Sequence, residues 1–256
     1  MIIDVTQLAG LACVFMRVTG CILFNPIFSR RNFPTLFRVG MTVVLSLMIV
    51  TYSDVGVDFG DTPFITTVAV LLKELFVGFT LGTVVSLFTY VVILGGEFID
   101  MQIGLAMSKL YDPQSGVQMS INATFLNMMF VFIFFGMNAH LTIIHLFLNS
   151  ALVVPYGQVV FAHPELPMKI LDIFCQCTIL GVKMTLPIAG MVFLLEIGVG
   201  ILMKAIPQIN VFVLNIQAKI LVGIVMIVVI FSPLSDYIER VITSMFSAMG
   251  SVMLLL

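Results

Sequence analysis

The side chains that most often do chemistry are few in this sequence, and their spacing fits no common catalytic arrangement. The histidines are His140, His145 and His163, and no acidic residue lies near the first two. A spacing of five does not place His140 and His145 on one helix face, as a spacing of four would. The sequence has no Gly-x-Ser-x-Gly, no phosphate-binding loop and no His-Glu-x-x-His. We therefore expect no enzymatic activity, no metal and no cofactor.

The four cysteines also favour a structural role. Cys13 and Cys21 lie inside the first apolar segment, whereas Cys175 and Cys177 form Cys-x-Cys. Redox and zinc sites use Cys-x-x-Cys instead. We expect all four side chains to be small buried apolar groups.

Polarity is concentrated in the stretch Gly95–Gly116, GGEFIDMQIGLAMSKLYDPQSG, which lies between two long apolar blocks. Pro113 interrupts a helix, and the run Asp112–Gly116 has the residue types of a tight turn. This run is either an ordinary solvated turn or a loop that faces water inside a pore. We expect Gly95–Met107 to be a packed helix end that holds the base of the loop.

A second polar stretch, Lys204–Lys219, reads KAIPQINVFVLNIQAK. Pro207 has no backbone N–H and interrupts the helix there. Amide side chains follow at Gln208, Asn210, Asn215 and Gln217. The stretch is either a turn between two helices or a lining of amides, which can bind an unfolded backbone without demanding a particular sequence.

The composition places these stretches in a membrane protein. Of the 256 residues, 61% are apolar and 9% are charged, with a mean hydropathy of +1.20. Soluble domains carry roughly 25% charged residues, so most of this surface must face lipid or other apolar protein. The net charge is −2 and no basic run is present, so we expect no nucleic-acid partner.

The apolar segments indicate helices, because the alternation of a membrane barrel is absent and open backbone cannot face lipid. About twenty apolar residues span a bilayer as a helix. The candidate segments are Leu8–Phe28, Val39–Ser53, Phe64–Leu94, Ile121–Val154, Ile170–Met203 and Ile220–Leu234.

Several of these segments are unlike plain spanning helices. Ile121–Val154 is too long for one crossing, and we expect it to fold back near Gly136-Met137-Asn138. Arg17, Lys183 and Glu196 lie inside apolar segments, where a charge facing lipid costs about 2.5–3.5 kcal/mol or more. These charges are either structural ion pairs between helices or part of a polar pathway.

Glycine spacing and loop charge add two expectations. Gly78 and Gly82 form Gly-x-x-x-Gly in an apolar helix, which lets another backbone approach closely. Ser29–Arg38 is basic and Tyr52–Asp61 is acidic, so the positive-inside rule puts the first loop in the cytoplasm and the N-terminus outside. We read the first apolar run as retained, because it is too long for a signal peptide.

Three stretches resemble the FliR family of flagellar export-gate proteins. They are GEFIDMQIGLAMSKLYDP at Gly96–Pro113, GVGILMKAIPQINVFVLNIQAKILVG at Gly198–Gly223, and PIFSRRNFPTLFRVG at Pro26–Gly40. Their order and spacing agree with the family over nearly the whole chain. Lys204 departs from the pattern, because members commonly have Arg there, and a bidentate contact by that side chain becomes doubtful.

The resemblance implies an all-α membrane protein of kinked helical hairpins. Residues 1–168 would form a FliP-like part and residues 169–256 a FliQ-like hairpin, with the division near Pro167. One copy would join about five copies of FliP and about four of FliQ, with FlhB at the entrance. The complex would carry unfolded flagellar substrates across the inner membrane, in the flagellar basal body.

The resemblance also assigns two functional regions. A plug loop would project into the channel from Leu110, Tyr111, Asp112, Pro113, Gln114, Ser115, Gly116, Val117 and Gln118. An entrance region that contacts FlhB and FliQ would include Lys204, Pro207, Gln208, Asn210 and Phe212.

Two alternatives remain open from the sequence. The homologous virulence secretion systems share the same pattern. A secondary transporter would suit helix breaks at Pro187 and Pro207. That class also predicts internal repeats, which we do not find, and stability without partner subunits.

Overall fold

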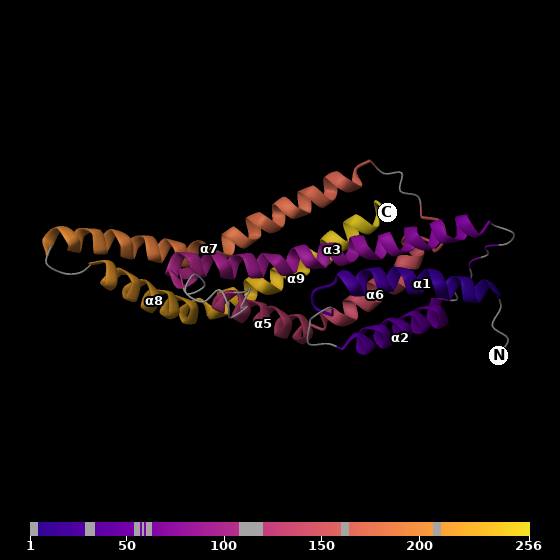
Figure 1. Ribbon diagram of the computed structural model, residues 1–256, viewed down its shortest axis with the longest axis horizontal. Helices are drawn as coiled ribbons and strands as arrows, with labels where there is room; N and C mark the ends of the chain where they lie inside the picture. The colour runs from indigo at the N-terminus through magenta and orange to yellow at the C-terminus, as the bar shows by residue number, and fades with distance from the viewer. Residues whose placement is uncertain are drawn as a thin grey trace. The chain divides into compact units, whose positions relative to one another are not determined.

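The described part of the computed structural model is built of α-helices (Figure 1). The structure describes residues 5–28, 34–53, 57, 59, 63–107, 120–159, 164–206 and 211–256. These ranges contain no strand, which confirms the expected all-α class. The helices are α1 (Val5–Phe24), α2 (Thr35–Ser53), α3 (Phe64–Ile103), the short 3₁₀ helix η1 (Leu105–Met107), α5 (Ile121–Gly136), α6 (Ala139–Val153), α7 (Leu166–Ala205), α8 (Val211–Val229) and α9 (Phe231–Met253).

Four of the described helices are long and apolar enough to cross a membrane, namely α1, α2, α3 and α7. Two bent pairs, α5 with α6 and α8 with α9, raise the number of candidate spans to as many as six. The membrane class that composition predicted is therefore supported by helix length as well.

The fourth apolar segment is interrupted where expected, but α6 is bent by 63° relative to α5 and does not fold back on it. Helix α5 ends at Gly136, Asn138 has a left-handed φ of 55°, and α6 begins at Ala139. Asparagine is one of the few residues other than glycine that adopts this conformation readily. The chain therefore bends at the residues where the length of the segment required it.

Two sequence expectations about helix ends were wrong. Pro187 does not break the chain, since α7 continues through it to Ala205. Neighbouring helices and local adjustment can accommodate a proline inside a membrane helix. The segment Ile220–Leu234 is not one helix, because α8 ends at Val229 and the bent α9 begins at Phe231.

The chain forms two compact units by its internal packing. The first contains Met1–Phe88, Phe135–Phe174 and Ile242–Leu256, and the second contains Thr89–Phe134 and Cys175–Val241. These units describe packing within one chain, and the expected division near Pro167 stays a prediction.

Glycines bring α1 and α3 into backbone contact in the first unit. A Cβ at Gly78 would overlap the carbonyl oxygen of Arg17, and one at Gly82 would lie 2.9 Å from the carbonyl oxygen of Cys21. Gly20 contributes from α1, where a Cβ would overlap the backbone of Leu75. The predicted small-residue interface at Gly78 and Gly82 is confirmed, and it faces α1.

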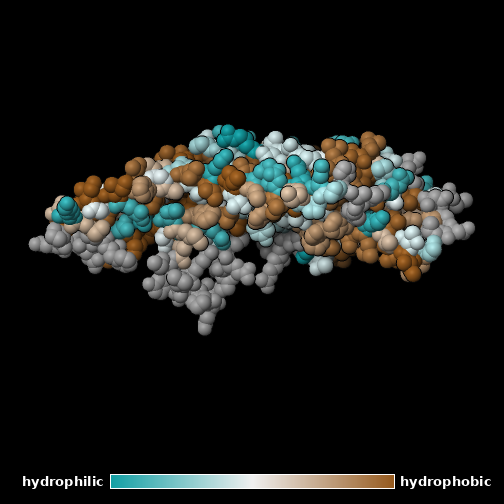
Figure 2. All heavy atoms as spheres, turned by 90° about the horizontal axis from the view of Figure 1, so that it is seen from above, coloured by the Kyte–Doolittle hydropathy of each residue, from teal (hydrophilic) through white to brown (hydrophobic). Residues whose placement is uncertain are grey.

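Apolar side chains remain on the outer surface, and Figure 2 shows them in brown over much of the face that it presents. In the most apolar windows of the two longest helices, 61% of the α3 residues but only 11% of the α7 residues are buried. Apolar residues of α7 that are at least half exposed include Leu171, Phe174, Ile179, Leu186, Phe193, Leu194 and Ile201.

The cysteine prediction holds for three residues and fails for one. Cys13, Cys21 and Cys177 are buried, whereas Cys175 is exposed. Residues two apart on a helix lie about 200° apart around its axis, so α7 cannot bury both Cys175 and Cys177 on one face.

Candidate functional site

The first polar stretch begins as the last turns of α3, as expected for a packed helix end. Asp100 is only 1% exposed, and its carboxylate accepts hydrogen bonds from the backbone N–H and the side-chain amide of Asn122. Asn122 lies in the first turn of α5, where free N–H groups favour a negative charge. Asp100 therefore caps α5 from another helix.

Two further contacts complete this junction, which we call the α3–α5 junction (Gly96, Asp100, Ser120, Asn122 and Ala123). The hydroxyl oxygen of Ser120 accepts a hydrogen bond from the Ala123 N–H, at 3.4 Å. A Cβ at Gly96 would overlap the backbone of Ala123, so only glycine permits this close approach. Side-chain capping and backbone contact therefore fix the start of α5 against α3.

Beyond this junction, α3 ends in a left-handed residue. Gly104 has a φ of 91°, and its N–H donates to the Asp100 carbonyl oxygen at 3.1 Å. The positive φ suits glycine and directs the chain out of the helix after Ile103. The expected plug loop, Leu110–Gln118, lies outside the described residues.

Helices α7 and α8 pack on the same end of α3. A Cβ at Gly181 of α7 would lie 3.2 Å from the carbonyl oxygen of Val91, and one at Gly95 would overlap the side chain of Met184. On α8, a Cβ at Gly223 would overlap the side chain of Ile103. Sequence reasoning missed these glycine contacts, because a single glycine in an apolar helix does not identify its neighbour.

The second polar stretch joins α7 and α8. Lys204 is exposed in the last turn of α7, where a positive charge suits the free carbonyl groups. Pro207, Gln208 and Asn210 lie outside the described residues. Phe212 belongs to α8, and its side chain is not described.

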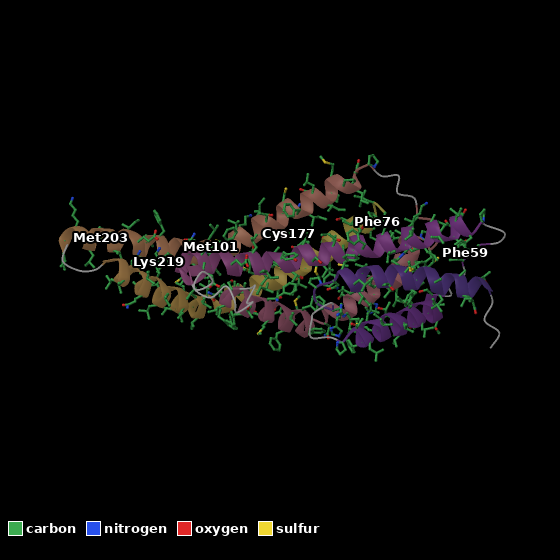
Figure 3. The ribbon with its side chains drawn as sticks, viewed as in Figure 1. Phe59, Phe76, Met101, Cys177, Met203 and Lys219 are labelled. Carbon is green, nitrogen blue, oxygen red and sulfur yellow. The ribbon has the colours of Figure 1, made fainter. Side chains whose placement is uncertain are left out.

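Glu196 and Lys219 form an ion pair across this connection, from α7 to α8. Figure 3 marks Met203 and Lys219 on the two helices that flank residues 207–210. Both charged groups are partly exposed, so the pair contributes little to stability.

Lys183 is exposed on α7 and borders a groove that Tyr237 and Arg240 also line. The Tyr237 hydroxyl donates a hydrogen bond to the Leu180 carbonyl oxygen at 2.8 Å, which ties α9 to α7 within the second unit. Within the second unit, Lys183 therefore borders this groove, whereas Glu196 forms its ion pair with Lys219.

A buried polar cluster surrounds Arg17 in the first unit. Arg17 and Glu74 are both 0% exposed, and the guanidinium Nε lies 2.7 Å from the Glu74 carboxylate. The ring of Tyr156 lies 4.0 Å from the guanidinium carbon. We call Arg17, Glu74, Ser150, Val154, Tyr156 and Gly157 the Arg17 cluster.

The remaining polar groups of the cluster come from the end of α6 and the turn that follows it. Arg17 donates to the Ser150 hydroxyl at 3.1 Å and to the Val154 carbonyl oxygen at 3.0 Å. The Gly157 N–H donates to the second Glu74 oxygen at 2.8 Å. Gly157 has a φ of 82°, which suits glycine in this turn.

The Arg17 cluster thus joins α1, α3, α6 and the following turn through a charge pair shielded from solvent. Because the pair is enclosed, Arg17 fits a structural ion pair between helices better than a residue of a polar pathway through the membrane. Sequence reasoning flagged Arg17 but did not find its partner, since Glu74 lies 57 positions away and a single sequence carries no pairing signal.

We predict that replacing Asp100 with alanine will loosen the start of α5. The substitution leaves the N–H and amide of Asn122 buried without an acceptor, at a cost of about 1–3 kcal/mol. Hydrogen exchange at the amides of residues 122–124 should accelerate. Met101→Ala is the control, because this neighbouring side chain is 62% exposed. Unchanged exchange in Asp100→Ala would show that the cap does not hold α5.

Comparisons with known proteins agree with this architecture. Residues 8–245 match the family described as bacterial export proteins, family 1. The flagellar biosynthetic protein FliR of Bacillus subtilis is 26% identical over 94% of this chain and 93% of its own length. FliR of Escherichia coli is 23% identical over 93% and 90% of the two chains. The Yop proteins translocation protein T of Yersinia pestis is 25% identical over 90% and 89%.

Proposed function

We propose, from the premise that this chain belongs to family 1 of the bacterial export proteins, that it is a membrane subunit of a type III protein-export gate. Its substrates are unfolded flagellar subunits, which move outward across the inner membrane at the flagellar basal body. The Yersinia relative supports the virulence system as the alternative. Family membership argues against a secondary transporter for small solutes.

The observation that carries this proposal is the exposed surface of α7. A helix of 40 residues is about 60 Å long, which is twice the roughly 30 Å hydrocarbon core of a bilayer. Lipid alone therefore cannot cover its apolar side chains along the whole length. Partner helices would cover the remainder, as expected for one subunit of a larger assembly.

We infer that these partners are FliP and FliQ, with FlhB at the entrance. Their identity follows from the resemblance to the FliR family. The exposed apolar faces of α7 and α8 are the surface on which they would pack. The entrance region includes Lys204, Pro207, Gln208, Asn210 and Phe212. The ion pair between Glu196 and Lys219 supports this placement, because it holds α7 and α8 side by side next to this region.

We further propose that Leu110–Gln118 is the plug of the channel. The α3–α5 junction supports this role, because a plug needs a fixed base from which to move. Asp100 and Gly96 fix the chain before the loop, and Ser120 fixes the chain after it. The turn residues Asp112–Gly116 then suit the tip of the loop.

Deleting Asp112–Gly116 should open the resting gate to ions. We expect the conductance of membranes containing the assembled complex to rise at least tenfold, because the residues that would block the pore are gone. The measurement is ion flux through the complex reconstituted in vesicles.

A matched control replaces the same five residues with glycine and serine, which keeps the length of the loop but not its side chains. Both variants must first show the mass of the intact complex, so that failed assembly is not read as leakage. Unchanged conductance in the deletion variant of an intact complex would count against the plug.

A further inference from the structure

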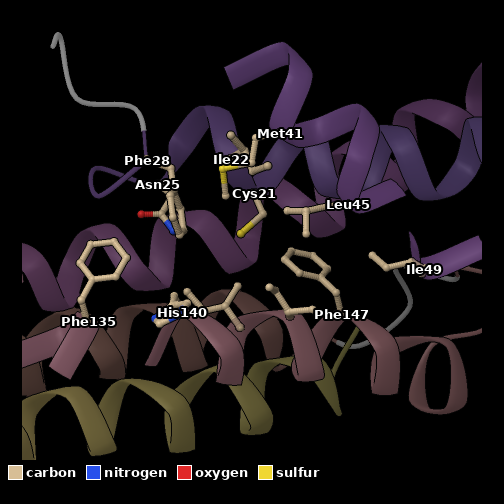
Figure 4. A pocket seen from close by; sticks show the side chains of 12 residues that line it. Cys21, Ile22, Asn25, Phe28, Met41, Leu45, Ile49, Phe135, His140 and Phe147 are labelled. Carbon is tan, nitrogen blue, oxygen red and sulfur yellow. The ribbon is translucent and has the colours of Figure 1, made fainter. Parts of the chain in front are cut away.

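The first unit contains an apolar cavity of about 230 Å³ (Figure 4). Met41, Leu45 and Ile49 line it from α2, and Ile143 and Phe147 line it from α6. The α2 residues span about 12 Å at 1.5 Å per residue, so the cavity is elongated along the helices. It exceeds the volume of about 150 Å³ at which apolar cavities accept benzene.

The buried amide of Asn25 faces this cavity. Asn25 is 0% exposed, and its Nδ2 has no hydrogen-bond partner within the described chain. Its Oδ1 accepts a hydrogen bond from the Ile27 N–H at 2.9 Å, which fixes the orientation of the amide. Figure 4 shows the nitrogen turned toward the helix that carries His140 and the oxygen turned away from it. The cavity therefore presents a hydrogen-bond donor on an apolar wall.

These features define the chemistry of the occupant. A buried donor without an acceptor costs about 1–3 kcal/mol, so a purely hydrocarbon ligand would leave this cost in place. The lining contains no lysine or arginine, so an anionic carboxylate has no matching charge. Nδ1 of His140 also lacks a partner, and in the tautomer that carries a proton there it can donate as well. An apolar chain with a neutral acceptor at one end fits all three observations.

The position of Asn25 in the chain indicates where that acceptor comes from. Helix α1 has 20 residues and a length of about 30 Å, which matches the hydrocarbon core. Asn25 follows the last residue of α1, so in a bilayer that α1 spans it would lie at the level where the acyl chains join their ester groups. Met41 to Ile49 then extend along α2, the next candidate span.

We propose that this cavity holds the part of one phospholipid acyl chain nearest its ester, and that the ester carbonyl accepts a hydrogen bond from Asn25. The chain lies between α1, α2 and α6 and fills space that the side chains leave empty. The proposal does not depend on the export function, because it uses the geometry of the first unit and the length of α1 as a membrane span.

The test uses a phosphatidylethanolamine with a photoreactive diazirine in its acyl chain, in membranes that contain the full chain. Mass spectrometry of peptides maps the labelled residues. We expect labelling at Cys21 and Ile49, which line the cavity and are each 1% exposed. Labelling at the exposed Val43 serves as an internal reference for ordinary lipid contact.

Leu45→Trp should fill the cavity and lower labelling at Cys21 and Ile49 at least tenfold, relative to Val43. Val44→Trp is the matched control, because Val44 is 61% exposed and does not line the cavity. Asn25→Leu should lower the same labelling about fivefold to tenfold, as expected for one lost hydrogen bond.

Three results would overturn the proposal. Cys21 and Ile49 could remain unlabelled in the original chain, which would show that the phospholipid does not enter the cavity. Leu45→Trp could label as strongly as Val44→Trp, which would place the probe elsewhere. A photoreactive free fatty acid could label the cavity when the phospholipid does not, which would exclude the ester as the recognised group.

Discussion

Replacing Glu74 with leucine should destabilise the protein by about 3–5 kcal/mol. The substitution leaves the Arg17 guanidinium charged and fully buried, and removing one partner of a buried pair costs this much. It also leaves the Gly157 N–H without its acceptor. Denaturant unfolding of the chain in its co-purified complex, in detergent micelles, measures the loss.

Two further variants separate the charge effect from other causes. Lys73→Met, at the neighbouring position of α3, should cost less than about 1 kcal/mol, because Lys73 is exposed and makes one contact with a carbonyl oxygen. The double variant Arg17→Met with Glu74→Leu should recover much of the loss, since apolar residues can replace a buried ion pair. A Glu74→Leu protein as stable as Lys73→Met would show that the pair is not shielded from water.

Gly78→Ala should force α1 away from α3 and destabilise the first unit. The added methyl group overlaps the carbonyl oxygen of Arg17, and backbone atoms cannot move aside as a flexible side chain can. Overpacking of this kind costs about 1–3 kcal/mol and occasionally more. The same denaturant unfolding in micelles measures it.

Gly40→Ala on α2 is the matched control for this substitution. A Cβ at Gly40 meets no atom within 4 Å, and alanine favours a helix over glycine by up to about 1 kcal/mol. The control should therefore be neutral or slightly stabilising. Equal stability of Gly78→Ala and Gly40→Ala would rule out the close approach of α1 and α3.

The sequence predicted what depends on local pattern. Apolar length predicted the membrane helices, excess length predicted the break at Gly136–Asn138, and the spacing of Gly78 and Gly82 predicted a close helix contact. Each of these follows from residues within a few turns of one another.

The sequence did not predict what depends on pairs of distant residues. Asp100 and Asn122 are separated by 22 positions, and only the packing of α5 on α3 shows that one caps the other. Pro187 appeared to be a break, but the helix around it continues. Cys175 appeared to be buried like Cys177, although its face of α7 is exposed.

The central claim is that this chain is one subunit of an export gate, with the apolar surface of α7 covered by partner helices. The most direct test is the mass of the complex that forms when the chain is co-expressed with FliP and FliQ. We predict one assembly that contains a single copy of this chain together with several copies of both partners. The account would be contradicted if the chain purified as a stable monomer or homo-oligomer and the partners assembled to the same mass without it.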